Sequence, residues 1–231
     1  MYSRGILFLF FILPGFLNAQ PGFNRIYRIY GAIDNFSRLI VDTDTLYCIG
    51  TAYDTMNLPS PLQVQMVKMD SSGNVIKSRL YKDSLNDFLG MDFLFGEIIK
   101  TSRGYFAFPV TAFNRASYLW IQVDKDLEIK AISKFQSPND LALFDETIIE
   151  MPDTGFLIAG NVQRPNLKQD GFIRRVDKHG NLMWFKYYGD YGKDESIRDI
   201  VKVSDNRFVL CGGVGPNSND PKTARAGLWV S

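Results

Sequence analysis

The amino-acid sequence contains a pattern that recurs about every fifty residues. Three segments share an apolar run ending in aspartate, then a turn rich in Asp, Asn, Ser and Gly, and then a second run. The aspartates are Asp70, Asp124 and Asp177, and an aromatic residue follows each of them by eleven positions (Tyr81, Phe135 and Tyr188). A repeat of this length limits the fold to architectures that stack one small supersecondary unit several times.

A second recurring element lies between these aspartate turns, at residues 39–50, 98–108, 148–160 and 200–212. Both elements consist of runs of β-branched and aromatic residues separated by residues that favour turns, which is typical of β-hairpins. One unit is therefore expected to hold four antiparallel strands. In the third unit we place these strands at about 147–151, 156–161, 172–176 and 183–188.

A four-stranded unit that repeats at this period fits the blade of a β-propeller. The second strands are apolar at consecutive positions, as in 156–159 and 208–211, and such strands must be buried on both faces. A β-sandwich, the competing architecture, would show alternation and no such period. The sequence thus predicts an all-β propeller, or a propeller fragment, with about four blades. The expected repeats span residues 37–81, 97–135, 147–188 and 197–231.

Residues 170–189 resemble the repeat of secreted bacterial β-propeller proteins, which is kelch-like in length. The other copies follow that pattern less closely, since Lys77 and Ala131 stand where the third copy has Trp184. The resemblance implies the propeller fold and export from the cell. It brings no catalytic residues with it.

The N-terminus has the parts of a secretory signal peptide. Arg4 supplies a positive charge, residues 6–13 are all apolar, and Ala19 provides a small residue at the expected cleavage point. Eight apolar residues are too few to span a bilayer, which needs about 20. We therefore predict a signal peptide at 1–19 and a propeller domain at 20–231, without stable membrane insertion. The mature protein is expected outside the cell or on its surface, with the periplasm as the alternative.

Export would place Cys48 and Cys211 in an oxidising compartment. Aligned on the glycines that end their runs, the two thiols occupy adjacent positions and should point to opposite faces. The geometry of a disulfide bond then favours two free thiols.

The two ends of the chain allow two outcomes. Residues 24–30 resemble the fourth strand of a unit, and residues 227–231 resemble a third strand. If the chain is complete, these two segments should pair and close a ring of four blades. If the blades continue in a longer parent chain, this part alone should form an open, aggregation-prone arc. The position of the last residue inside a strand favours the second outcome.

Composition excludes several classes of function. The chain has 26 Lys and Arg against 25 Asp and Glu, so the basic excess that nucleic-acid binding requires is missing. One histidine and two cysteines leave no material for a His/Cys metal site or a histidine-based triad. His179 and the aspartate turns are interpreted as solvated, capped hairpin turns. Their spacing fails that of sialidase-type Asp boxes and of quinoprotein propellers. We therefore expect no enzyme activity, catalytic residues, cofactor or metal.

The loops that precede each unit suggest one functional face. They are long, and they hold eight acidic residues, among them Asp145, against Lys82 and Lys193. Such loops on a rigid scaffold commonly carry binding functions. The preferred prediction is a non-catalytic binding or scaffold module for a protein, glycan or surface partner, and the alternative is a glycan-active or other hydrolase. The expected partner-binding residues are Asp87, Asp92, Phe93, Asp140, Phe144, Asp190, Tyr191 and Asp194.

Overall fold

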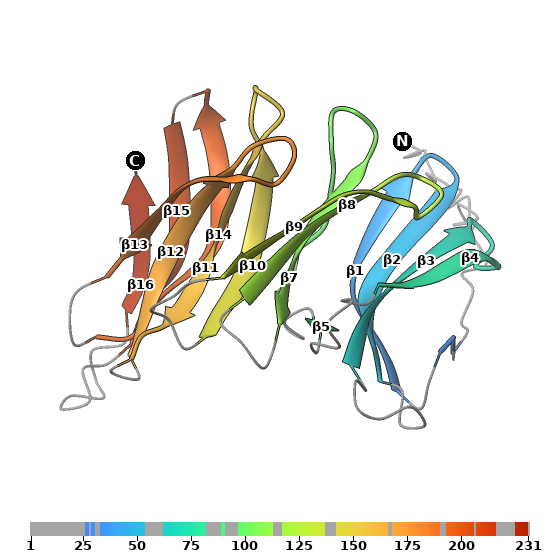
Figure 1. Cartoon of the computed structure of the whole chain (residues 1–231), viewed down its shortest axis with the longest axis horizontal. Helices are drawn as coiled ribbons and strands as arrows, with labels where there is room; N and C mark the ends of the chain where they lie inside the picture. Colours follow the sequence, from blue (N-terminus) through green and yellow to red (C-terminus); the bar gives the residue numbers. More distant parts are fainter. Residues whose placement is uncertain are drawn as a thin grey trace, which may run out of the picture.

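The computed structural model describes residues 26–27, 29–30, 33–53, 62–81, 89–90, 97–112, 117–136, 142–165, 168–189, 193–205, 207–215 and 225–230. These residues form β-sheets that stand side by side along an arc (Figure 1). The all-β fold with about four propeller-type blades is therefore confirmed. Among the described residues, no helix is long and apolar enough to cross a membrane.

Each blade follows the chain, and neighbouring strands pair antiparallel. Blade 1 holds β1 (Ile33–Asp42), β2 (Thr45–Tyr53), β3 (Leu62–Asp70) and β4 (Val75–Tyr81). Blade 2 holds β5 (Leu89–Gly90), β6 (Ile99–Lys100), β7 (Phe106–Ala112), β8 (Ser117–Val123) and β9 (Ile129–Gln136). Blade 3 holds β10 (Ala142–Glu150), β11 (Phe156–Gln163), β12 (Gln169–Val176) and β13 (Leu182–Tyr188). Blade 4 holds β14 (Glu195–Ser204), β15 (Arg207–Val214) and β16 (Arg225–Val230).

The first strands of neighbouring blades are adjacent, since β10 contacts both β6 and β14. We call β1, β6, β10 and β14 the inner strands. In blade 3 the inner strand begins at Ala142, five residues before the start expected from the sequence. The reason is a β-bulge between Asp145 and Thr147, which breaks the alternation of side chains along the strand.

The second strand of blade 3, β11, is buried on both faces, as its continuous apolar run predicts. The run at 208–211 in β15 of blade 4 departs from this expectation, since it is partly buried and its Cys211 is exposed. In β11, Phe156 and Ile158 belong to a cluster with Trp120 of blade 2. Leu157 and Ala159 belong to a separate cluster with residues of blade 4. Blade 3 is thus held between blades 2 and 4 by apolar packing, which is the main source of stability in such a stack.

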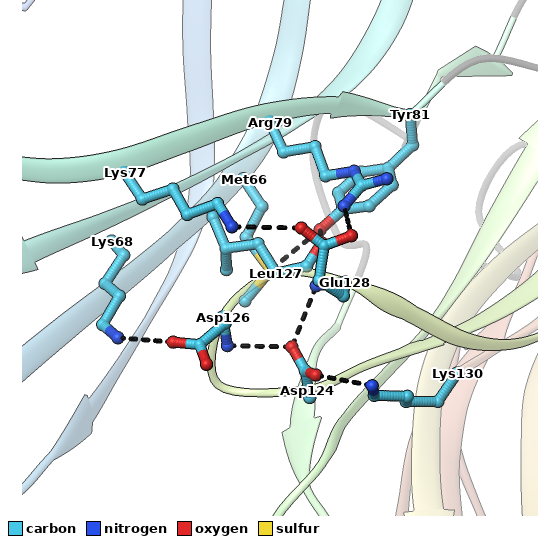
Figure 2. A network of polar contacts seen from close by, with 10 residues as sticks. All are labelled: Met66, Lys68, Lys77, Arg79, Tyr81, Asp124, Asp126, Leu127, Glu128 and Lys130. Atoms are coloured by element: carbon cyan, nitrogen blue, oxygen red, sulfur yellow. Dashed lines mark hydrogen bonds and ion pairs between the residues drawn. The ribbon is translucent and has the colours of Figure 1, made fainter.

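Blades 1 and 2 are also joined by a polar network, shown in Figure 2. The carboxylate of Glu128 accepts hydrogen bonds from Lys77, at 3.0 Å, and from Arg79. The Tyr81 hydroxyl donates to the Leu127 carbonyl oxygen at 3.0 Å, and burial raises the pKa of this phenol. The fourth strand of one blade is therefore anchored to the turn between the third and fourth strands of the next.

These turns have one construction in all three complete units. The carboxylates of Asp70, Asp124 and Asp177 accept hydrogen bonds from backbone N–H groups two and four residues later. A residue with positive φ follows each aspartate by three positions: Gly73, Leu127 and Gly180. The interpretation of these segments as capped hairpin turns is confirmed.

Cys48 and Cys211 are free thiols on different blades. Cys48 lies half-buried on β2, and burial raises its pKa to about 11. Cys211 is exposed on β15.

The described N-terminal residues lie against blade 1. The Tyr27 hydroxyl donates to the Gly73 carbonyl oxygen at 2.6 Å, and the Tyr30 hydroxyl donates to Ser78 Oγ at 2.8 Å. Blade 1 and β16 stand at opposite ends of the arc (Figure 1). The pairing that would close a ring of four blades is therefore not found among the described residues. The predicted signal peptide, residues 1–19, lies outside them.

Candidate functional site

The inner strands carry a β-bulge at one repeated position. The pairing register shifts at Ser37 in β1, at Glu146 in β10 and at Arg198 in β14. A glycine of the second strand lies opposite each bulge: Gly50, Gly160 and Gly212. A Cβ atom there would come within 2.0 Å or less of a backbone oxygen of the inner strand. Glycine is thus required for the bulged strand to approach, and bulges commonly redirect functional side chains.

Two carboxylates from different blades meet beside the bulge of β10. The Thr147 hydroxyl donates to Glu97 Oε2 at 2.6 Å and lies 3.4 Å from Asp199 Oδ1. Because both distances share the Thr147 oxygen, the two carboxylate oxygens lie no more than 6.0 Å apart. Thr147 is buried, Glu97 is half-buried and Asp199 is exposed. The arrangement leaves two acids open to a ligand, and a buried hydroxyl between them.

Backbone groups fix the orientation of both acids. Glu97 Oε2 also accepts from the Ile148 N–H at 3.1 Å, and Asp199 Oδ1 accepts from the Ile200 N–H at 2.8 Å. Glu97 precedes β6, Thr147 lies in β10 and Asp199 in β14. The site is therefore built from three consecutive blades, and its geometry depends on how those blades pack.

A second polar network lies around the same two bulges of β10 and β14. The buried Glu146 Oε1 accepts hydrogen bonds from Asn161 Nδ2 at 2.7 Å and from the Arg198 guanidinium at 2.6 Å. Asn161 Oδ1 in turn accepts from the Ile197 N–H at 3.0 Å. These bonds tie β10, β11 and β14 together around the two bulges, so that Arg198 is held next to Asp199.

Asp145, the residue before Glu146, forms a buried ion pair with Arg174. The Arg174 guanidinium donates to Asp145 Oδ2 at 2.8 Å, and both side chains are almost fully shielded from solvent. Burial raises the pKa of Asp145 to about 6, although the Arg174 charge opposes this shift. Asp145 was expected in a loop, and this expectation is wrong, because the strand continues through the bulge.

The structure describes two of the eight residues expected to bind a partner. Phe144 was expected on a loop but lies half-buried inside β10. The reason is the same as for Asp145, because the strand continues through the bulge. Asp194 accepts a hydrogen bond from the Gln169 N–H at 3.0 Å and lies 3.7 Å from Lys168 Nζ. In the described part of the chain, neither Phe144 nor Asp194 contacts Glu97 or Asp199. The other six lie outside the described residues: Asp87, Asp92, Phe93, Asp140, Asp190 and Tyr191.

Sequence reasoning missed Glu97, Thr147 and Asp199, although the repeat contains the necessary signal. Each stands immediately before the shared apolar pair of its inner strand, so the alignment places all three at one position. His179 is exposed in its turn, as expected. In the described part of the chain, no group of three or more His, Cys, Asp or Glu side chains is arranged to hold a metal ion.

No protein-family model matches this sequence, and no curated protein matches it. Among solved structures, the chain is similar to the Hadza microbial sialidase Hz136, with a TM-score of 0.57, 9% identity and coverage of 85% of this chain. It is also similar to a candidate exo-β-1,3-galactanase from Bifidobacterium bifidum s17, with a TM-score of 0.50, 12% identity and 81% coverage. A third similar structure is the exo-β-1,3-galactanase 1,3Gal43A from Clostridium thermocellum, with a TM-score of 0.48, 11% identity and 83% coverage.

This chain spans 43%, 63% and 47% of the lengths of those three proteins. At such low identity the likeness shows the fold. It also contradicts the expectation that this chain is not an enzyme, because the similar structures carry the names of glycoside hydrolases. That expectation rested on the absence of known short motifs in the sequence.

Proposed function

We propose that this chain forms the catalytic part, or a portion of it, of a glycoside hydrolase. The observation that carries the proposal is the meeting of Glu97 and Asp199 at Thr147, three residues that come from three consecutive blades. Similarity to solved glycosidases supports the reaction class.

The chemistry of glycoside hydrolysis needs two carboxyl groups on either side of the scissile bond. One protonates the leaving oxygen, and the other activates water or attacks the sugar, at separations of about 5 to 9.5 Å. Glu97 Oε2 and Asp199 Oδ1 lie no more than 6.0 Å apart, which is below the upper limit of this range, and both side chains are partly open to solvent. Glu97, which is less exposed and receives the Thr147 hydrogen bond, is suited to a fixed role, and the exposed Asp199 is suited to contact a ligand.

Glu97→Gln and Asp199→Asn should each lower kcat/KM by about 10²- to 10⁴-fold, because each removes one proton-transfer group. The substrates are aryl β-galactosides, aryl sialosides and β-1,3-linked galacto-oligosaccharides, assayed with the purified full chain. Asp205→Asn serves as the matched control, because Asp205 is an exposed acid of the β14–β15 turn that pairs only locally with Lys202. Wild-type hydrolysis that survives both substitutions would disprove the assignment, as would the absence of hydrolysis across the panel.

We further infer that the enzyme is exported and acts on glycans outside the cytoplasm. The apolar run at 6–13 and the small residue Ala19 support this inference. Expression of the full chain in a bacterial host should yield a mature protein whose N-terminal sequence begins at Gln20. Quantitative recovery of protein that still begins at Met1 would contradict export.

A further inference from the structure

We call the side of blade 1 that faces away from blade 2 the first face of the arc. This face exposes an apolar position that is buried in every other blade. Leu39, Ile98, Ile148 and Ile200 occupy the same place in the four inner strands. Ile98, Ile148 and Ile200 are 6%, 0% and 3% exposed, because each packs against the blade before it. Leu39 of blade 1 is 55% exposed.

We call the side of blade 4 that faces away from blade 3 the last face of the arc. This face shows the complementary pattern. The next position of the inner strands holds Ile40, Ile99, Ile149 and Val201. Each of the first three packs into the apolar cluster that its blade shares with the following blade. Val201 of blade 4 is 56% exposed, and Val203 on the same strand is 58% exposed. The two end faces are therefore the unmatched halves of one interface that the molecule already makes three times.

The outer part of the first face already carries a contact of the type found between blades. Between blades 1 and 2, Tyr81 of the fourth strand donates its hydroxyl to the carbonyl of Leu127, the positive-φ residue of the next blade's turn. Tyr27 donates in the same way to Gly73, the corresponding residue of blade 1. The segment around Tyr27 and Tyr30 thus takes the place of the fourth strand of a blade before blade 1.

We propose that blade 4 of a second copy of this chain packs on the first face of blade 1. Three observations identify this occupant. Blade 4 presents Val201 and Val203 on the face that the following blade covers elsewhere in the arc. The segment at Tyr27 already supplies a fourth-strand contact on the first face of blade 1. Both halves of the repeated interface are present on one chain, so that no foreign surface is required.

Two copies joined in this way form a closed assembly. The contact is heterologous, from blade 4 of one copy to blade 1 of the other, and it closes when the two copies are related by a two-fold rotation. The result is a ring of eight blades, which is within the range of about four to eight found in propellers. Apolar faces of this kind on a free arc would otherwise promote aggregation.

The test is the mass of the full chain in solution, by light scattering after gel filtration over a range of concentrations. The wild type should have twice the mass of one chain. Leu39→Glu and Val201→Glu should each weaken association by about tenfold or more, because each buries a charge in an apolar interface. Ile132→Glu is the matched control, since Ile132 is 50% exposed on β9 of blade 2, away from both ends of the arc.

Mixing the two variants gives a directional result. The Leu39 variant retains an intact blade 4 face, and the Val201 variant retains an intact blade 1 face, so an equimolar mixture should regain dimers that neither forms alone. Each variant should still unfold in one cooperative thermal transition, because both positions are exposed in the free chain. A wild-type monomer at all concentrations, polymers that lengthen with concentration, or a mixture that remains monomeric would overturn the proposal.

Discussion

Replacing Asp145 by alanine should lower the free energy of unfolding by roughly 3–5 kcal/mol. The Arg174 side chain is 2% exposed and donates to Asp145 Oδ2 at 2.8 Å. The substitution leaves a guanidinium that cannot lose its proton in an interior that cannot solvate it. Urea unfolding at pH 7, monitored by tryptophan fluorescence, measures the change.

A double variant separates the contribution of the intact ion pair to the free energy of unfolding from the loss caused by removing one partner. Asp145→Leu combined with Arg174→Met replaces both charges by apolar groups, and it should be neutral or stabilising by about 1–4 kcal/mol. A single variant within about 1 kcal/mol of the wild type would contradict the buried pair. If the double variant were as unstable as the single one, the loss would come from packing and not from the loss of the Asp145 carboxylate beside Arg174.

The sequence predicted the blades well because their main signals are local. Turns with an aspartate cap and apolar second strands depend on residues close together in the chain, as at Asp177 or in 156–159. The start of β10 was placed too late for a physical reason. The bulge at Glu146 changes the side-chain alternation, so Asp145 before it was interpreted as part of a loop.

The candidate site was missed because none of its residues, taken alone, stands in a recognisable functional motif. Glu97 and Asp199 are about a hundred residues apart, and each precedes an apolar pair in an otherwise ordinary strand. The propeller brings them to one place because its inner strands lie next to one another. A repeat alignment extended by one residue would have collected Glu97, Thr147 and Asp199 in one column. Their hydrogen bonds, however, depend on the packing between blades.

The same bulge makes a second large effect predictable. Gly212→Ala should destabilise the protein by about 3 kcal/mol or more, because overpacking against the backbone has no side chain that can yield. A Cβ atom at Gly212 would lie 1.7 Å from the carbonyl oxygen of Ser196. Strands β14 and β15 must separate there, and the bulge at Arg198 that positions Asp199 would move with them. Urea unfolding measures the loss of stability, and hydrolysis by the remaining folded protein reports the displacement of Asp199.

Gly213→Ala is the matched control, one residue further along the same strand. Its Cβ atom would meet only Ser196 Oγ, at 3.3 Å, and neither glycine has a positive φ, so that backbone strain does not separate the two variants. The control should stay within about 1 kcal/mol of the wild type. If both variants were equally stable, the close approach of the bulged strand would not be what requires glycine. If Gly212→Ala were unstable but fully active per folded molecule, then Asp199 would not depend on the bulge. Loss of both properties at Gly212 and of neither at Gly213 would link the repeated glycine to the geometry of the proposed active site.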